Sequence, residues 1–241
     1  MKLSIIVPTL NEEKVIAKTL GGLKGLRSAS YEIIVSDGAS TDRTVELARQ
    51  LADKVVVHDP KTRQTIGAGR NAGAEQASGE FFVFMDADVQ IPNINEFFRQ
   101  ALERFETDPR LCGLTVFLKV LPEHVTLSDK LFFGVVNRLY QFYNNVLHLG
   151  MASGEFQMIR AETFKKVGGF NPALVVGEDN DLFGRLSKVG KTRVETGLFV
   201  MHTSRRAHNV GWTKLLWLWT INMVYNKVIK RSFSKEWKVI R

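Results

Sequence analysis

The sequence has little of what marks disulfide-bonded, membrane-spanning or disordered proteins. Its single cysteine, Cys112, cannot form an internal disulfide, and its apolar neighbours indicate a buried thiol in a reducing compartment. No window holds the roughly 20 apolar residues that a membrane span needs, and no segment is low in complexity. The apolar run at residues 3–7 ends too soon, at Pro8, to be a signal peptide. We therefore expect a globular cytoplasmic protein.

The composition suits one α/β domain with an anionic partner. The 241 residues are 44% hydrophobic and 24% charged, with a formal net charge of +8. Such a charge favours nucleic acid, a phosphate-rich ligand or an anionic membrane face. The basic residues gather beside tryptophans near the C-terminus, not along a groove-reading motif, so we expect no nucleic-acid partner.

Short apolar runs alternate with helical segments along the chain. Asn11 is expected to cap the first helix and Thr41 or Asp42 the second. The predicted strands are 3–7, 32–36, 54–57, 81–85, 114–120 and 155–160, and the predicted helices are 12–24, 42–51, 95–106, 127–149 and 178–188. Residues 67–78 are predicted to be a loop that enters a helix. Continuous apolar strands separated by helices indicate a mostly parallel sheet covered on both faces. Ligands of such sheets bind beyond the carboxyl ends of the strands.

Asp86-Ala87-Asp88 directly follows the apolar strand 81–85. Residues two apart in an extended chain point to the same side, so the two carboxylates would converge at the ligand edge. Hard oxygen ligands there suit Mg²⁺ or Mn²⁺ bridging a diphosphate. The alternative is a pair of solvated turn acids, but the position after a buried strand favours the metal site.

Two further polar residues, Asp37 and Arg70, each have two possible roles. Asp37 ends a strand and could accept hydrogen bonds from a nucleoside, or form an Asx-turn into the next helix. Arg70 lies among small residues, 67–73, whose spacing is not a dinucleotide fingerprint. These small residues would let a helix pack close to the site. Arg70 could then reach a phosphate, or lie at the surface beside a tightly packed helix.

The second half of the chain offers an acidic cluster and a basic one. Glu178, Asp179 and Asp181 lie at a predicted helix start, where the helix dipole favours acids, but Asp179 could also be a general base. His202 or His208 could complete a metal shell with the aspartates, or be structural. Between them, paired arginines could clamp a diphosphate: Arg205 and Arg206.

Residues 127–149 and 212–229 are rich in aromatic side chains, and we interpret both as amphipathic helices. Tryptophans with basic flanks are typical of a membrane interface, so we expect peripheral membrane contact through residues 211–230, at the cytoplasmic face. The alternative is a helix packed on the core or in a dimer.

Several motifs together resemble family 2 glycosyltransferases of the GT-A fold. Each motif is common by itself, but their order is specific, and the resemblance spans about residues 3–190. The matching segments are 5–13, 37–44, 70–73, 86–88, 168–170 and 178–182. The resemblance implies an α/β GT-A domain over 1–210, with a Rossmann-like donor half (1–92), an acceptor half (93–210) and a basic amphipathic helical tail (211–241).

The resemblance also implies roles for individual residues. Asp86, Ala87 and Asp88 would hold the metal and diphosphate, with Asp88 the direct ligand. Asp179 would be the base of an inverting transfer. The remaining donor contacts would be Pro8, Thr9, Glu12 and Asp37, with Arg70, Arg205 and Arg206 near the phosphates, and the acceptor side would include Glu178, Gly154 and Glu155.

The Q-x-x-R-W element of processive family members is missing after Asp181, which favours single-sugar transfer. We expect a UDP-, GDP- or dTDP-sugar donor and an acceptor hydroxyl or lipid phosphate, and the tail favours a lipid-linked acceptor. Two other functions fit this sequence less well. A sugar-phosphate nucleotidyltransferase needs a glycine-rich loop where residues 8–12 have none, and an inactive membrane-associated module would not need Asp86, Asp88 and Asp179.

Overall fold

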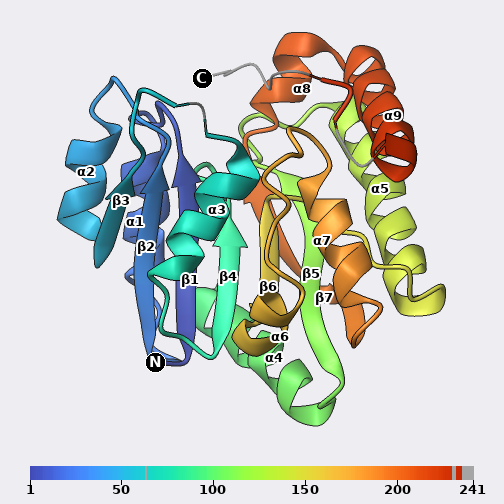
Figure 1. The fold of residues 1–241 in the computed structure, drawn as a ribbon, viewed down its shortest axis with the longest axis horizontal. Helices are drawn as coiled ribbons and strands as arrows, with labels where there is room; N and C mark the ends of the chain where they lie inside the picture. Colours follow the sequence, from blue (N-terminus) through green and yellow to red (C-terminus); the bar gives the residue numbers. More distant parts are fainter. Residues whose placement is uncertain (63, 230–231, 235–241) are drawn as a thin grey trace.

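One twisted sheet runs through the computed structural model, which describes residues 1–62, 64–229 and 232–234 (Figure 1). Within these residues the sheet has seven strands in the order β3-β2-β1-β4-β6-β5-β7. Their bounds are β1 Leu3–Thr9, β2 Tyr31–Asp37, β3 Lys54–Val57, β4 Phe81–Met85, β5 Leu111–Val120, β6 Phe156–Arg160 and β7 Lys191–His202. Only β6 runs antiparallel to its neighbours, so the mostly parallel sheet is confirmed.

Helices cover both faces of the sheet. Side chains of α1 (Ile16–Leu23), α2 (Thr44–Leu51) and α4 (Ile94–Thr107) join the core on one face. Those of α3 (Ile66–Glu75), α6 (Ala161–Lys166) and α7 (Glu178–Leu186) join the core on the other. In β1 the side chain of Ile5 enters the first core and that of Ile6 the second. Burial on both faces is why the strands are continuous apolar runs.

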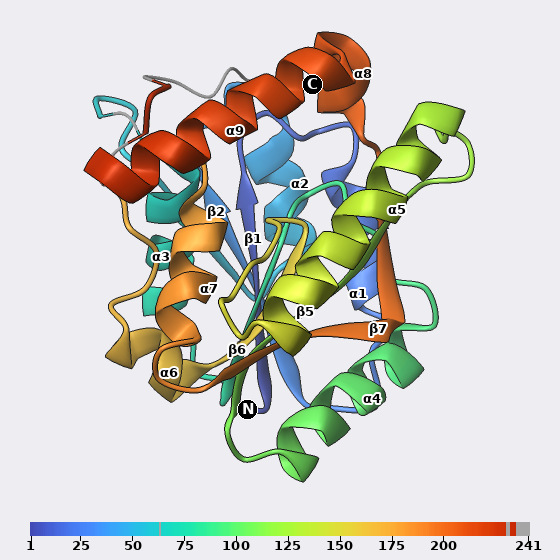
Figure 2. The same cartoon turned by 90° about the vertical axis from the view of Figure 1, so that its right-hand side faces the viewer.

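The remaining helices lie at the far end of the sheet from β3. They are α5 (Leu127–Gln141), which continues into a π-helical turn (η1, Phe142–Val146), and then α8 (Arg205–Val210) and α9 (Trp212–Ile229). Figure 2 shows α5 and α9 on the same side of the molecule. Trp212 stacks on Phe132 of α5 with ring centroids 3.7 Å apart, and its indole N–H donates to Asp129.

Several predicted boundaries were wrong, mostly at capped ends. Asn11 does not cap a helix. It has a left-handed backbone (φ 55°), its side chain accepts the Thr41 N–H, and α1 begins only at Ile16. Neither Thr41 nor Asp42 is the cap residue of α2, although the Asp42 carboxylate accepts the Thr44 N–H. Three further elements, α6, β7 and α8, were not predicted, and the helix predicted over 127–149 changes to π geometry at Phe142.

The helical tail is present, but its amphipathic character was predicted wrongly for the part that the structure describes. Apolar residues are distributed around α9 and do not form one stripe. Leu215 is buried and Trp212 packs on α5. This agrees with the alternative prediction of a helix packed on the core. Residues 230–231 and 235–241 of the tail lie outside the described residues. No helix in the described part of the chain is long and apolar enough to cross a bilayer.

Candidate active site

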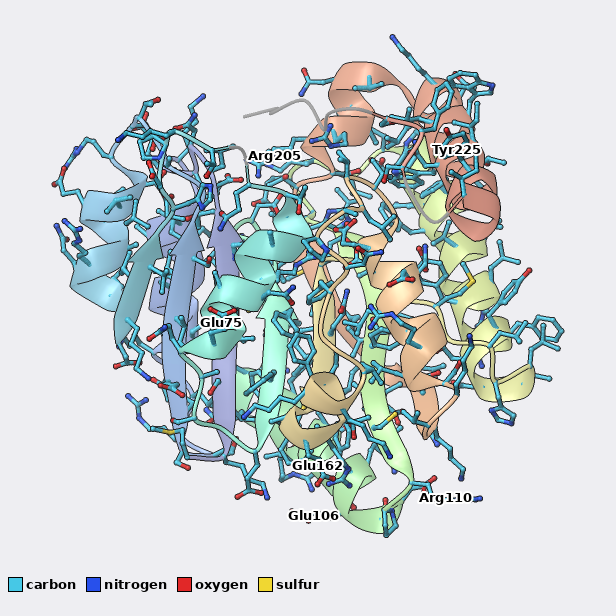
Figure 3. All side chains as sticks on the ribbon, viewed as in Figure 1. Glu75, Glu106, Arg110, Glu162, Arg205 and Tyr225 are labelled. Carbon is cyan, nitrogen blue, oxygen red and sulfur yellow. The ribbon has the colours of Figure 1, made fainter. Side chains whose placement is uncertain are left out.

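Polar side chains from distant parts of the chain meet at the carboxyl ends of β1, β2 and β4. Figure 3 shows Arg205 there, between the sheet and the C-terminal helices. Its guanidinium contacts the Glu12 carboxylate (Nη2 to Oε1, 2.6 Å) and lies 3.7 Å from the nearer oxygen of Asp88. The expected ligand edge is therefore formed by both halves of the domain and by α8.

Arg70 is the organising residue beneath this edge. Its guanidinium group is positively charged, yet the residue is only 1% exposed. One terminal nitrogen donates to Asp179 (2.7 Å) and Glu178 (3.2 Å), and the other donates to Asp86 (3.0 Å) and the Gly154 carbonyl (3.2 Å). The structure thus buries Arg70 and does not place it at the surface, and its two terminal nitrogens are engaged by three carboxylates and the Gly154 carbonyl.

Small residues in α3 make this position of Arg70 possible, as the sequence indicated. A Cβ atom at Gly73 would lie 2.5 Å from the side chain of Ile6, so α3 can approach β1 only with glycine there. Thr65 caps the helix by accepting the Ala68 N–H. The close approach directs the Arg70 side chain under the end of β4.

Asp179 lies in the first turn of α7 with its carboxylate directed toward this cluster. Its Oδ1 accepts hydrogen bonds from Arg70 and from the buried amide of Gln157 (2.5 Å). Burial raises the pKa of Asp179 and the Glu155 carboxylate raises it further, while Arg70 and Gln157 oppose the change. A raised pKa makes a carboxylate a stronger base at neutral pH.

The cluster contains more carboxyl groups than cationic groups. Burial and the Asp179 carboxylate raise the pKa of Glu178 to about 8, although the Arg70 guanidinium lowers it. Loss of hydration raises the pKa of Asp86 to about 7, although the Arg70 guanidinium lowers it. The carboxylates of Glu155, Asp88 and Asp179 also raise this pKa. Carboxylates that crowd in this way attract a cation.

The metal ligands predicted from the sequence are only partly brought together. The Asp88 carboxylate accepts the Thr203 hydroxyl and lies beside Arg205. Among the described residues, no group of three or more His, Cys, Asp or Glu side chains is close enough to hold a metal ion. The oxygen donors fit Mg²⁺ or Mn²⁺ by their chemistry, but a cation on Asp88 would have to compete with Arg205.

The two histidines have different surroundings. His202, at the end of β7, is 6% exposed, and its Nδ1 lies 3.8 Å from Glu155. Its Nε2 is buried without a hydrogen-bond partner in the described part of the protein, as expected for an atom that binds a ligand. The Nε2 of His208 instead lies 2.8 Å from Asp129 of α5, which excludes His208 from this cluster.

The donor-side residues of the first half are mostly buried. Asp37 is fully buried and accepts the Thr9 hydroxyl (2.8 Å) and the Ser40 N–H (2.7 Å), which is the Asx-turn alternative. Pro8 is half-buried, and Ala87 packs in the core. Arg206 follows Arg205 in α8 and is half-buried. A nucleoside contact by Asp37 would require its turn to open.

Two shallow hollows adjoin the cluster. One, of about 200 Å³, is lined by Asn11, Glu12, Glu13, Lys14, Asp42 and Arg205. The other, of about 170 Å³, has Lys14, Lys18, Asp88, Gln90, His124 and Thr203 among its lining residues. Three residues near the cluster were not predicted from the sequence: Lys14, Thr203 and Gln157. Only Gln157 gave a signal, because it is a polar residue inside an apolar strand.

A model of one protein family, described as glycosyl transferase family 2, matches residues 4–168. The chain belongs to glycosyl transferase family 2. Its sheet and helices also match solved structures of the GT-A fold. A mannosyltransferase from Pyrobaculum calidifontis, in complex with GDP-Man and Mn²⁺, aligns with a TM-score of 0.70 at 19% identity, over 97% of this chain and 65% of that one. TarS of S. aureus aligns with a TM-score of 0.65 at 20% identity, over 98% of this chain and 67% of that one.

Curated relatives match over shorter stretches. A dolichol-phosphate mannosyltransferase of Pyrococcus furiosus is 40% identical over 98 residues, which is 38% of this chain and 27% of that protein. The succinoglycan biosynthesis protein ExoA of Rhizobium meliloti is 25% identical over 193 residues, 77% of this chain and 58% of the relative. The family 2 chain thus spans well under two thirds of the length of these relatives.

Proposed function

We propose that this chain transfers a sugar from a nucleotide-sugar donor to an acceptor, with Asp179 as the general base. The observation that carries the proposal is the bridge through Arg70. One guanidinium contacts both Asp179 at 2.7 Å and Asp86 at 3.0 Å. It therefore holds the candidate base and the candidate diphosphate site at a fixed separation, as a displacement at one anomeric carbon requires.

The donor would lie across the carboxyl ends of β1, β2 and β4, near Thr9, Glu12 and Asp37. Asp88 and Asp86 would hold a divalent metal, Mg²⁺ or Mn²⁺. When bound, such a cation offsets the negative charge of a leaving diphosphate. Mn²⁺ and GDP-Man are present together in the structure of the Pyrobaculum mannosyltransferase, which supports this proposal.

Asp179 would take the acceptor proton through Oδ2. Its other oxygen is held by Arg70 and Gln157. Oδ2 faces Gly154, where an added Cβ would lie 3.2 Å away. A side chain at this position would crowd both Asp179 and Arg70, and Gly154, Glu155 and Glu178 would form the walls on the acceptor side. One base suffices for a single displacement, which inverts the anomeric centre.

Arg205 would change partners when the donor binds. In the present structure it contacts Glu12 and lies near Asp88. Its charge is therefore already at the expected diphosphate position, and Arg206 follows in the same helix. Arg205 would then stabilise the leaving group, and its departure from Asp88 would make that carboxylate available to the metal.

The acceptor is proposed to be a lipid-linked hydroxyl or phosphate at the cytoplasmic face of a membrane, and one sugar would be transferred in each reaction. The name of a Campylobacter jejuni relative, a GalNAc(5)-diNAcBac-PP-undecaprenol beta-1,3-glucosyltransferase, supports a lipid-linked acceptor. That relative is 34% identical over 37% of this chain.

A thermal-shift screen tests the donor class and the metal together. UDP-, GDP- and dTDP-sugars are added with and without Mn²⁺, to the wild-type protein and to Asp88→Asn. One nucleotide-sugar should raise the melting temperature of the wild type by several degrees only when Mn²⁺ is present, and Asp88→Asn should lose most of this effect. If no donor raises the melting temperature of the wild type, the proposed function is wrong.

A further inference from the structure

The outer face of α5 carries a row of solvent-exposed apolar side chains. They follow one another at spacings of four and three residues, which places them on one side of a helix. The row continues into the π-helical turn. Its members are Leu127, Leu131, Val135, Leu139, Phe142 and Val146, with exposed fractions of 73, 66, 60, 48, 49 and 59%. We call these six residues the α5 stripe, and so large an exposed apolar patch marks an interaction surface.

The exposed charges of α5 itself have one sign. No Asp or Glu occurs between Asp129 and Glu155, and Asp129 is itself buried. The cationic side chains of α5 are Lys130 and Arg138, both exposed. Residues 196–234, which include α9, also contain no acid. The apolar row is therefore flanked by positive charge.

A tryptophan of α9 extends this surface. Trp212, Leu215 and Trp219 face inward, because Trp212 and Trp219 contact Phe132 of α5 and Leu215 is buried. Trp217 points away from them and is 61% exposed. Helix α9 itself lies on the same side of the molecule as α5 in Figure 2. Tryptophan beside basic residues suits the polar–apolar boundary of a bilayer.

We propose that the α5 stripe, together with Trp217, docks this protein on an anionic lipid surface. A second copy of the chain is a poorer partner. A two-fold contact through this face would bring Lys130 and Arg138 of both copies together, and α5 has no exposed acid to neutralise them. Anionic headgroups supply the missing negative charge while the acyl region accepts the apolar side chains.

The position of α5 connects this surface to the proposed reaction. The inner side of the helix faces the acceptor side of the site, where Tyr140 lies near acidic groups. Burial raises the pKa of Tyr140, and the carboxylates of Glu155 and Asp179 raise it further. If the proposed function holds, the acceptor is lipid-linked and enters from this side.

Vesicle sedimentation tests the docking surface without donor or turnover. The wild type is compared with Leu131→Glu/Val135→Glu, and with the matched control Val57→Glu. Val57 is also exposed (45%) but lies in β3, at the opposite edge of the sheet. On phosphatidylcholine vesicles containing about 30 mol% phosphatidylglycerol, the stripe variant should bind at least about tenfold more weakly than wild type, with Val57→Glu within about twofold. Pure phosphatidylcholine should bind wild type weakly.

Several results would overturn this inference. Binding of the stripe variant at the wild-type level, or no binding by wild type, would do so. A wild-type dimer in sedimentation velocity that becomes monomeric in the stripe variant would assign the face to a second copy. The donor-induced thermal shift is measured on the same samples. An intact shift shows that the variant is folded and that the proposed function stands or falls separately from the docking.

Discussion

At the scale of single residues, Asp179 carries the proposed chemistry. Asp179→Asn should lower turnover by about 10²–10⁴-fold while donor affinity persists, because the amide cannot accept the acceptor proton. Initial rates give the first quantity and calorimetric donor titration the second. Asp181→Asn is the matched control, since Asp181 lies in the same turn but is paired with Arg185. Near-normal turnover in Asp179→Asn would remove this residue from the role.

Gly154 is a second residue whose identity the site requires. A Cβ atom there would lie 2.5 Å from a terminal nitrogen of Arg70 and 3.2 Å from Oδ2 of Asp179. Gly154→Ala should therefore destabilise the protein by about 1–3 kcal/mol and reduce transfer to the acceptor. The control is Gly134→Ala in α5, where nothing lies within 4 Å and helix propensity favours alanine. Equal stability and activity of both variants would contradict the proposed geometry.

Glu32 provides a pH dependence that is separate from the active site. Burial opposes its ionisation, but Lys54, Ser4 and Ser78 donate to its carboxylate and lower its pKa to about 2. Because the folded-state pKa lies below the ordinary value of 4.5, the stabilisation is complete above about pH 4.5 and is lost as the pH falls toward 2.

Glu32→Gln should consequently lower the free energy of unfolding at pH 7 by up to about 3 kcal/mol, and this difference should shrink between pH 4.5 and pH 2. Urea unfolding at several pH values measures it. Glu46→Gln is the control, because Glu46 is exposed and pairs only with Arg43 three residues away in the sequence. A difference for Glu32→Gln that does not vary with pH would refute the assignment.

At the scale of elements, Asp129 ties three helices together. Its carboxylate accepts the Thr126 N–H in a capping box, lies 2.8 Å from His208 of α8 and accepts the Trp212 indole N–H of α9. Asp129→Ala should cost about 1–3 kcal/mol, since it removes the cap and leaves buried donors without partners.

Hydrogen exchange should locate this effect of Asp129→Ala. Amides of residues 205–222 should exchange faster than in wild type, while those of β1 and β4 should not change. Ser128→Ala is the neighbouring control because Ser128 is exposed. Unchanged exchange in α8 and α9 would show that Asp129 does not hold them.

The whole molecule shows how far local patterns reach. Strand β4 begins and ends where the sequence predicted, because a strand buried on both faces is an uninterrupted apolar run. The half-exposed edge strand β3 also has its predicted bounds, from its three consecutive valines. The first helix began four residues late, because Asn11 bonds across to the Thr41 turn and does not cap its own segment. Helix starts depend on such partners, so they were less predictable than buried strands.

The same distinction holds for the candidate site. Asp86 and Asp88 at the end of β4 and Asp179 at the start of α7 were identified from motif and position. The role of Arg70 was not, because two of its partners, Glu178 and Asp179, are 108 and 109 residues away in the sequence. Similarly, nothing near His208 in the sequence shows that it pairs with Asp129, 79 residues away.

By itself, the sequence determined the layered α/β fold and the family, and it predicted the edge of the sheet at which a ligand would bind. Each of these follows from hydrophobic runs and turn residues that act over a few positions. Only the tertiary structure decided which carboxylates surround Arg70, which histidine lies beside the cluster, and that α5 presents its apolar stripe to solvent. Those features depend on which segments meet in space, because the energy of a buried charge or an exposed apolar face comes from its neighbours across the fold.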